Sequence, residues 1–134
     1  MKSLLAFRSF SFVSLQYGAQ AADLALLNAD SVAGVLDWPE AHADFDETAA
    51  LVAALDLVIT VDTTIAHLAG ALGKPTWVMV SHNPEWRYLR EGCTMPWYPT
   101  MRLFRRRRGG DWADTIAEIA QALETWQAAA GERD

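Results

Sequence analysis

The order of apolar and polar positions along the chain predicts strands that alternate with helices. Short apolar runs have the length and composition of β-strands over residues 10–15, 32–36, 57–61, 76–80 and 101–104. Apolar residues at helical spacing predict helices over residues 22–29, 46–55, 63–72 and 111–128. This alternation indicates an α/β fold, with a mostly parallel sheet, flanking helices and right-handed crossovers.

Local signals predict where several of these elements begin and end. Asp46 is expected to cap the helix that follows it. Gly73 is expected to end a helix in the left-handed conformation, with Pro75 just beyond it. The pair Trp38-Pro39 is expected to break the chain after the second strand.

Composition limits the class of protein. The 134 residues suffice for one domain, expected over residues 1–130 with a short tail over residues 131–134. A formal charge of −6 argues against general nucleic-acid binding, which needs a basic face. No apolar stretch approaches the roughly 20 residues of a membrane span. A lone cysteine, Cys93, has no disulfide partner, so we expect a cytoplasmic location.

Two further stretches have more than one interpretation. Residues 81–100 form a long connection of a kind that is often functional. Within it, Trp86 is expected to anchor the loop in the core, and a place on the wall of a sugar or acceptor cleft is the alternative. The run Arg105 to Arg108 is expected to be a solvated strand end or loop, with phosphate binding as the alternative.

The strongest candidate for chemistry is the junction between the third strand and the next helix. Asp62, Thr63 and Thr64 stand where the strand ends, and His67 follows one helical turn later. Ligands bind outside the carboxyl ends of parallel strands, and a helix N-terminus offers unpaired N–H groups to a phosphate. Aspartate and threonine are also ordinary helix caps. The local pattern leaves capping and ligand binding open.

The sequence around this junction resembles a known family. "LDLVITVDTTIAHLAGALGKPTWVMV", residues 55–80, looks like the donor-binding segment of the heptosyltransferase-like glycosyltransferases, glycosyltransferase family nine. It is more closely similar to bacterial tetratricopeptide-repeat proteins that carry such a domain at their C-terminus. Further landmarks are "FVSLQYG" at residues 12–18, "PWYPTMRLFR" at 96–105 and "GDW" at 110–112. The matching positions of the junction are Asp62, Thr63, His67, Leu68, Ala69, Ala71, Leu72, Gly73 and Pro75.

The resemblance implies the donor-binding, Rossmann-like C-terminal half of a two-domain GT-B enzyme that transfers a sugar from a nucleotide diphosphate. By this resemblance, a diphosphate would contact Thr63, Thr64 and His67, and Asp62 would shape the loop or meet the sugar. Gln16 would face the same cleft. The nucleoside would lie near Asp44 and Phe45. The family generally needs no bound metal or other cofactor, and no catalytic base can be assigned in this chain.

The chain departs from the family pattern at its N-terminal side. Residues 1–9 leave room for little more than the end of the helix expected before "FVSLQ", so we expect the strand before that helix and the acceptor domain to be missing. In a 3-2-1-4-5-6 sheet the missing strand is the central one, so two strand edges would be unpaired. We therefore expect a truncated domain that completes its sheet in a homodimer or a strand-swapped dimer.

Two other functions remain open. One is a non-catalytic α/β domain that acts in assembly or binds nucleotide only weakly. The other, a flavodoxin-like regulatory domain, would need carboxylates after the first strand, and "SLQYG" has none.

Overall fold

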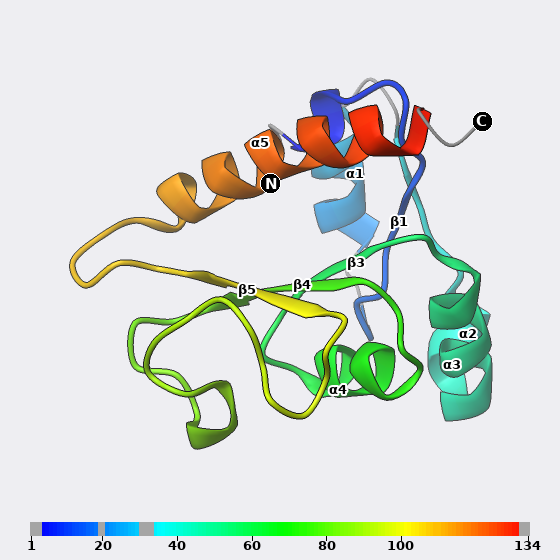
Figure 1. Cartoon of the computed structure of the whole chain (residues 1–134). Coiled ribbons are helices and arrows are strands. Elements are labelled where there is room, and N and C mark those ends of the chain that lie inside the picture. Colours follow the sequence, from blue (N-terminus) through cyan, green and yellow to red (C-terminus); the bar gives the residue numbers. More distant parts are fainter. Residues whose placement is uncertain (1–3, 19–20, 30–33, 132–134) are drawn as a thin grey trace.

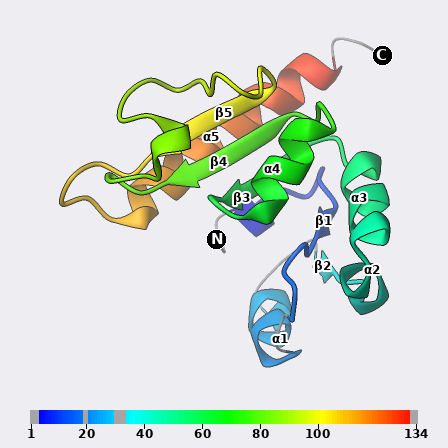
Figure 2. The same cartoon turned by 90° about the horizontal axis from the view of Figure 1, so that it is seen from below.

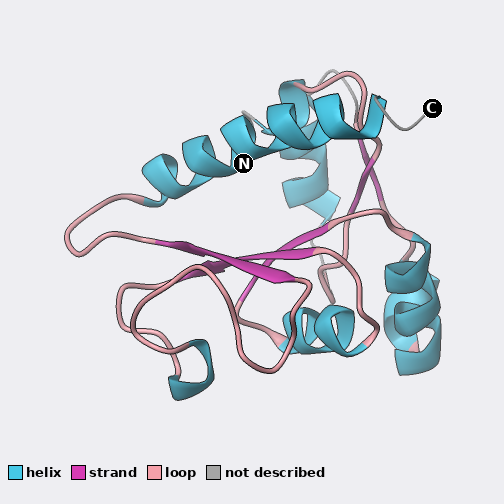
Figure 3. Ribbon diagram, viewed as in Figure 1, coloured by secondary structure: helices cyan, strands magenta, loops and turns pink. Residues whose placement is uncertain are grey.

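The computed structural model describes residues 4–18, 21–29 and 34–131, which form short strands and flanking helices (Figures 1 and 3). Along the chain the elements are η1 (Leu4–Ala6), β1 (Phe12–Val13), α1 (Ala21–Ala29), β2 (Val35–Leu36), α2 (Pro39–Ala43), α3 (Phe45–Ala54), β3 (Val58–Val61), α4 (Thr64–Ala71), β4 (Thr76–Val80), η2 (Trp86–Tyr88), β5 (Met101–Arg105) and α5 (Trp112–Gly131). The fold is therefore α/β, as the sequence predicts.

Every ladder between the strands that the structure describes is parallel, and these strands fall into two sheets. One sheet has the order β3-β4-β5, in which Val58 pairs with Thr76 and Thr76 pairs with Met101. The other has the order β1-β2, with only two paired positions. Every residue of β4 is buried, as expected of a central parallel strand covered on both faces.

The smaller sheet, β1-β2, and the larger sheet, β3-β4-β5, are not joined in the described part of the chain. β1 and β3 each have one hydrogen-bonded neighbour, and no ladder joins these two strands in the described part of the chain. Figure 2 shows β1 and β2 beyond the β3 edge of the larger sheet. Among the described residues, β1 and β3 thus each have one edge without a strand partner.

Two apolar layers cover the larger sheet. In Figure 1 α5 lies on one face and α4 on the other. The α5 side is a cluster that includes Leu4, Trp77, Phe104, Ile119 and Leu123. The α4 side is a second cluster, made by Ala66, Val78, Val80, Tyr88, Met95, Met101 and Leu103. The second cluster joins α4 to the connection over residues 81–100, and so it fixes the loop beside the candidate site.

Several predicted boundaries are confirmed and one is corrected. Gly73 has a φ of +69° and follows α4 as a left-handed cap, as predicted. The strand β2 ends at Leu36, before the predicted break at Trp38-Pro39, and Pro39 also opens the short helix α2, because proline suits the first position of a helix.

The cap of α3 is Asp44 and not Asp46. The Asp44 carboxylate accepts from the backbone amides of Asp46 and Glu47 at 2.7 and 3.3 Å. Asp44 has the extended backbone of an N-cap, with φ −125° and ψ 137°, whereas Asp46 already lies inside the helix.

Other predictions concern the chain ends and the membrane. Residues 132–134 of the predicted tail lie outside the described residues, and residue 131 ends α5. No described helix is long and apolar enough to cross a membrane.

Candidate functional site

The helix α4 begins directly after β3 without a side-chain cap. Thr63 occupies the N-cap position, with φ −120° and ψ 176°, but its side chain does not accept from the helix amides. Its hydroxyl instead lies 3.3 Å from the Thr60 hydroxyl and 3.5 Å from the Val61 carbonyl. The amide of Ala66 donates to the Thr63 carbonyl at 3.0 Å. The amides of Thr64 and Ile65 have no acceptor among the described residues, which removes the capping interpretation of Thr63 and leaves two donors open at the start of the helix.

Asp62 and Thr64 lie on either side of this cap, and both are exposed. The described residues give the Asp62 carboxylate no ion pair and the Thr64 hydroxyl no hydrogen bond. The sequence raised the alternative that Asp62 caps the helix, and no such hydrogen bond forms. Both side chains are available at the amino end of α4.

His67 lies one turn further along α4, among aromatic side chains. Its ring is 6.0 Å from that of Tyr88 and 5.8 Å from that of Tyr98, measured between centroids. His67 lines a cavity of about 270 Å³ together with four residues of the long connection, Trp86, Arg87, Trp97 and Tyr98. His67 thus connects the helix start to this cavity, which the strand–helix pattern alone does not predict.

The remaining predicted residues lie on other elements. Gln16 follows β1 and is exposed, and its backbone amide donates to the Ser14 hydroxyl at 3.4 Å. Asp44 caps α3 and Phe45 begins it, with a ring that is 58% exposed. No hydrogen bond or ion pair between described residues connects these three to the junction at Asp62 to His67. Their roles at the cleft and the nucleoside stay predictions.

The prediction that Trp86 anchors the long connection is wrong, because its side chain is 67% exposed. The buried anchor is Tyr88, two residues later, with a side chain that is 1% exposed in the cluster of α4 and β4. Sequence reasoning missed it because neighbouring aromatic residues in a loop carry no periodic signal that separates inward from outward side chains.

Tyr88 also places a polar group next to the junction. Its buried hydroxyl has no hydrogen-bond partner among the described residues. Burial raises the pKa of this hydroxyl to about 12, and the negative charge of Asp62 acts in the same direction. Tyr88 therefore stays a neutral phenol at physiological pH, within electrostatic reach of Asp62.

The arginine run from Arg105 to Arg108 has mixed surroundings. Arg105 is half-buried, and burial lowers the pKa of its guanidinium, which donates to backbone carbonyls of the long connection. Arg106 lies over the Trp112 ring at 5.1 Å, and Arg107 pairs with Glu118 at 3.6 Å. Arg108 is exposed, as the predicted solvated loop requires.

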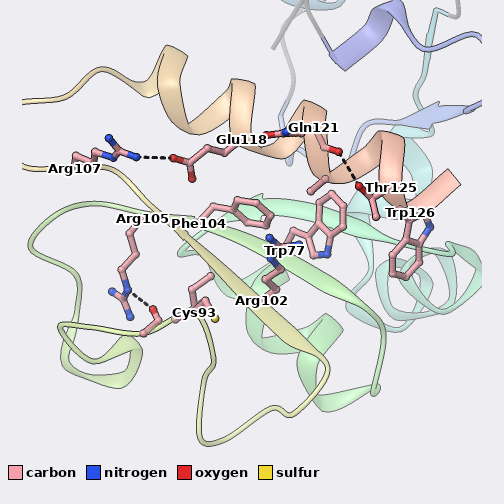
Figure 4. A pocket seen from close by; sticks show the side chains of 13 residues that line it. Trp77, Cys93, Arg102, Phe104, Arg105, Arg107, Glu118, Gln121, Thr125 and Trp126 are labelled. Carbon is pink, nitrogen blue, oxygen red and sulfur yellow. Dashed lines mark hydrogen bonds and ion pairs between the residues drawn. The ribbon is translucent and has the colours of Figure 1, made fainter. Parts of the chain in front are cut away.

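A larger cavity of about 830 Å³ lies on the other face of the sheet, between β5 and α5 (Figure 4). Its walls include Trp77, Phe104 and Trp126, with Arg102 over the Phe104 ring at 4.6 Å. None of the junction residues lines it.

Comparison with known proteins identifies the class of the junction segment. Residues 40–82 match the family model of glycosyltransferase family 9, the heptosyltransferases. The chain thus carries a family 9-like segment, which runs from α2 through β4 and contains the junction. The chain is also similar to Protein FlbA of Caulobacter vibrioides, with 38% identity over 121 residues. That alignment covers 87% of this chain and 20% of FlbA, so the chain spans about a fifth of the length of this relative. No solved structure matches the chain.

Replacing Tyr88 by phenylalanine is expected to leave the fold as stable as before or up to about 1 kcal/mol more stable at pH 7. The ring stays in the core, while a buried hydroxyl without a partner disappears. Urea unfolding measures the effect. A loss above about 1 kcal/mol at pH 7 would show that the hydroxyl has a partner.

The same substitution is expected to change the alkaline dependence of stability. Because the folded pKa of Tyr88 is about 12 and the unfolded value is 10.0, the folded state holds this proton more tightly. The stability that this proton contributes is fully present below pH 10. It is lost as the pH rises through 12, where the free energy of unfolding falls by about 2 to 3 kcal/mol. Tyr88→Phe should lack this loss. The control is Tyr17→Phe, since Tyr17 is 82% exposed.

Proposed function

We propose that this chain is a nucleotide-diphosphate-sugar-binding domain of a glycosyltransferase-like protein, with glycosyl transfer as the family reaction. The observation that carries the proposal is the uncapped N-terminus of α4, directly after a parallel strand and inside the family 9-like segment. Free helix amides and the positive end of the helix dipole suit a diphosphate. The adjacent hydroxyls of Thr63 and Thr64 add donors at the same place.

Each predicted residue has a role in this proposal. Thr63, Thr64 and His67 bind the diphosphate, and Asp62 shapes the loop or accepts from sugar hydroxyls. Gln16 faces the cleft from the end of β1. The nucleoside lies near Asp44 and Phe45; because the Asp44 carboxylate already accepts two amides, the exposed Phe45 ring is the better contact for a base.

Catalysis would need groups beyond those assigned in this chain. Glycosyl transfer requires an acceptor and a base held in geometry against the donor. We propose that an acceptor domain of the GT-B type supplies them, in a cytoplasmic protein that also carries tetratricopeptide repeats. No residue of this chain is proposed as the base.

The split sheet favours one further function, a non-catalytic domain that acts in assembly. β1 and β3 each have an edge without a strand neighbour in the described part of the chain. Such edges pair readily with another strand. We propose a homodimer or a strand-swapped dimer as the assembly in which these edges are satisfied.

Titration calorimetry with UDP, GDP, ADP and dTDP tests the leading function. At least one of them should bind. Thr64→Ala and His67→Ala should each weaken that binding about 10- to 100-fold, since each removes a hydrogen bond to a charged group. Thr125→Ala on the exposed side of α5 is the control and should bind as the wild type does. Binding to none of the four would favour the assembly domain.

A further inference from the structure

Two tryptophans of the long connection are exposed side by side. Trp86 is 67% exposed and Trp97 is 59% exposed. Their ring centroids are 6.3 Å apart, and the ring planes make an angle of 83°. Large aromatic surface left in contact with water is unfavourable, and in folded proteins it marks binding surfaces. The pair forms an open corner with two indole walls.

The loop that presents this corner is fixed in place. Tyr88 and Met95, which come between the two tryptophans in the sequence, are buried in the cluster with α4 and β4. The amide of Leu103 on β5 donates to the Cys93 carbonyl at 2.8 Å, and the Arg105 guanidinium donates to four further carbonyls of the loop. The indoles are therefore held in position before any ligand arrives, which lowers the entropic cost of binding.

Polar groups border the aromatic corner. The Arg87 guanidinium lies 5.1 Å from the centre of the Trp86 ring and pairs with Glu85. His67 of α4 lines the same cavity. Apolar walls with a few donors at the rim suit a ligand that has both C–H faces and hydroxyl edges.

The cavity adjoins the proposed diphosphate site through His67. This residue lies one turn after Thr64, so a group that extends from a diphosphate at the start of α4 past His67 would meet the two indoles. The volume of about 270 Å³ is below the ~300–1,000 Å³ of sites for drug-sized ligands, which fits one ring. Two walls at a right angle do not form the parallel slot that would hold a flat base.

We propose that this corner binds the pyranose ring of the nucleotide-sugar donor. The C–H face of the sugar packs against the indole of Trp86 or Trp97, and Arg87 and His67 hydrogen-bond its hydroxyls. The inference rests on the proposed function, since it places the sugar next to a diphosphate at α4. It adds two tryptophans and an arginine that lie outside the segment matched by the family model.

The test compares the affinity for each nucleoside diphosphate with the affinity for the corresponding nucleotide sugar. Calorimetry is run on the full chain with UDP and UDP-glucose, GDP and GDP-mannose, ADP and ADP-glucose, and dTDP and dTDP-glucose. In one pair or more the sugar should raise the affinity. Trp86→Ala and Trp97→Ala should each weaken binding of that nucleotide sugar about 10-fold and leave binding of the free diphosphate unchanged. Trp86→Tyr should keep part of the gain, because an aromatic wall remains.

The control is Trp38→Ala, an exposed tryptophan at the start of α2, which should bind both ligands as the wild type does. Circular dichroism checks that each variant is folded. If the diphosphate binds but no sugar raises its affinity, or if the tryptophan variants weaken both ligands equally, the sugar site is wrong and the proposed function stands. If no diphosphate binds, the proposed function and this inference both fail.

Discussion

Replacing Arg105 by alanine is expected to lower the free energy of unfolding by about 3 kcal/mol and to release the long connection. The guanidinium donates to the carbonyls of Gly92 at 2.6 Å, Leu89 at 3.1 Å, Tyr88 at 2.6 Å and Glu91 at 3.2 Å. Removal of one charged donor leaves all four acceptors without it. Hydrogen bonds to charged groups are worth about 1.5 to 3 kcal/mol each, but bonds that share one guanidinium do not add.

The backbone conformation of Leu89 depends on this clamp. It has a φ of +57°, in the left-handed region that a leucine seldom adopts, and its carbonyl is one of the four acceptors. Arg105→Lys should recover less than half of the loss, because one ammonium cannot reach carbonyls on several sides as the planar fork does.

Urea unfolding measures the Arg105 effect, and limited trypsin digestion after Arg87 and Arg90 reports on the loop itself. Arg108→Ala is the matched control, since it removes an exposed arginine from the same run and should change stability by less than about 0.5 kcal/mol. Equal stability and equal cleavage of the Arg105 and Arg108 variants would contradict the clamp.

Replacing Gly70 by alanine is expected to destabilise the fold by about 1 to 3 kcal/mol, against the usual preference of helices. Gly70 is buried in α4, and an added Cβ would lie 2.5 Å from Cγ of the Tyr98 ring. Alanine normally gains about 1 kcal/mol over glycine inside a helix, but here the ring must be displaced from the helix surface.

A double-mutant cycle separates the two effects. In a Tyr98→Ala background, Gly70→Ala should become stabilising, because the clash is gone and the helical preference remains. Ala71→Gly, at the exposed neighbouring position of α4, measures that preference in the same helix. Thermal or urea unfolding measures the stability of the two single variants, the double variant and Ala71→Gly. Destabilisation by Gly70→Ala in both backgrounds would exclude Tyr98 as the cause. The same ring contacts His67, so its displacement should also change the cavity.

The sequence predicted best where a periodic pattern and a local signal agree. The strand Thr76–Val80 and the cap at Gly73 are as predicted, because a fully apolar run and a glycine before proline each permit little else. Asp44 and Asp46 are both good caps, and only the backbone conformation decides between them. The proline that predicted a break also suits the start of a helix.

For the candidate site, the sequence predicts the position of the junction residues and does not predict which side chains of the long connection lie beside them. The strand–helix junction has a regular geometry, so the place of Asp62, Thr63 and Thr64 follows from it. Side chains of an irregular loop point in directions that no period encodes, so the exposed Trp86 was assigned to the core and the buried Tyr88 was missed. The sequence does not predict the hydrogen bonds of Arg105 to the loop, because it does not show which of four consecutive arginines lies beside backbone carbonyls.

The separation of the two sheets has a consequence for cooperativity. β1 and β2 share two paired positions, whereas β4 has neighbours on both sides and is wholly buried. Local opening should therefore cost much less for the smaller sheet, and its amide hydrogens should exchange with solvent well before those of β4. We expect the larger sheet and α4, which hold the junction at Thr64, to stay folded while the smaller sheet opens.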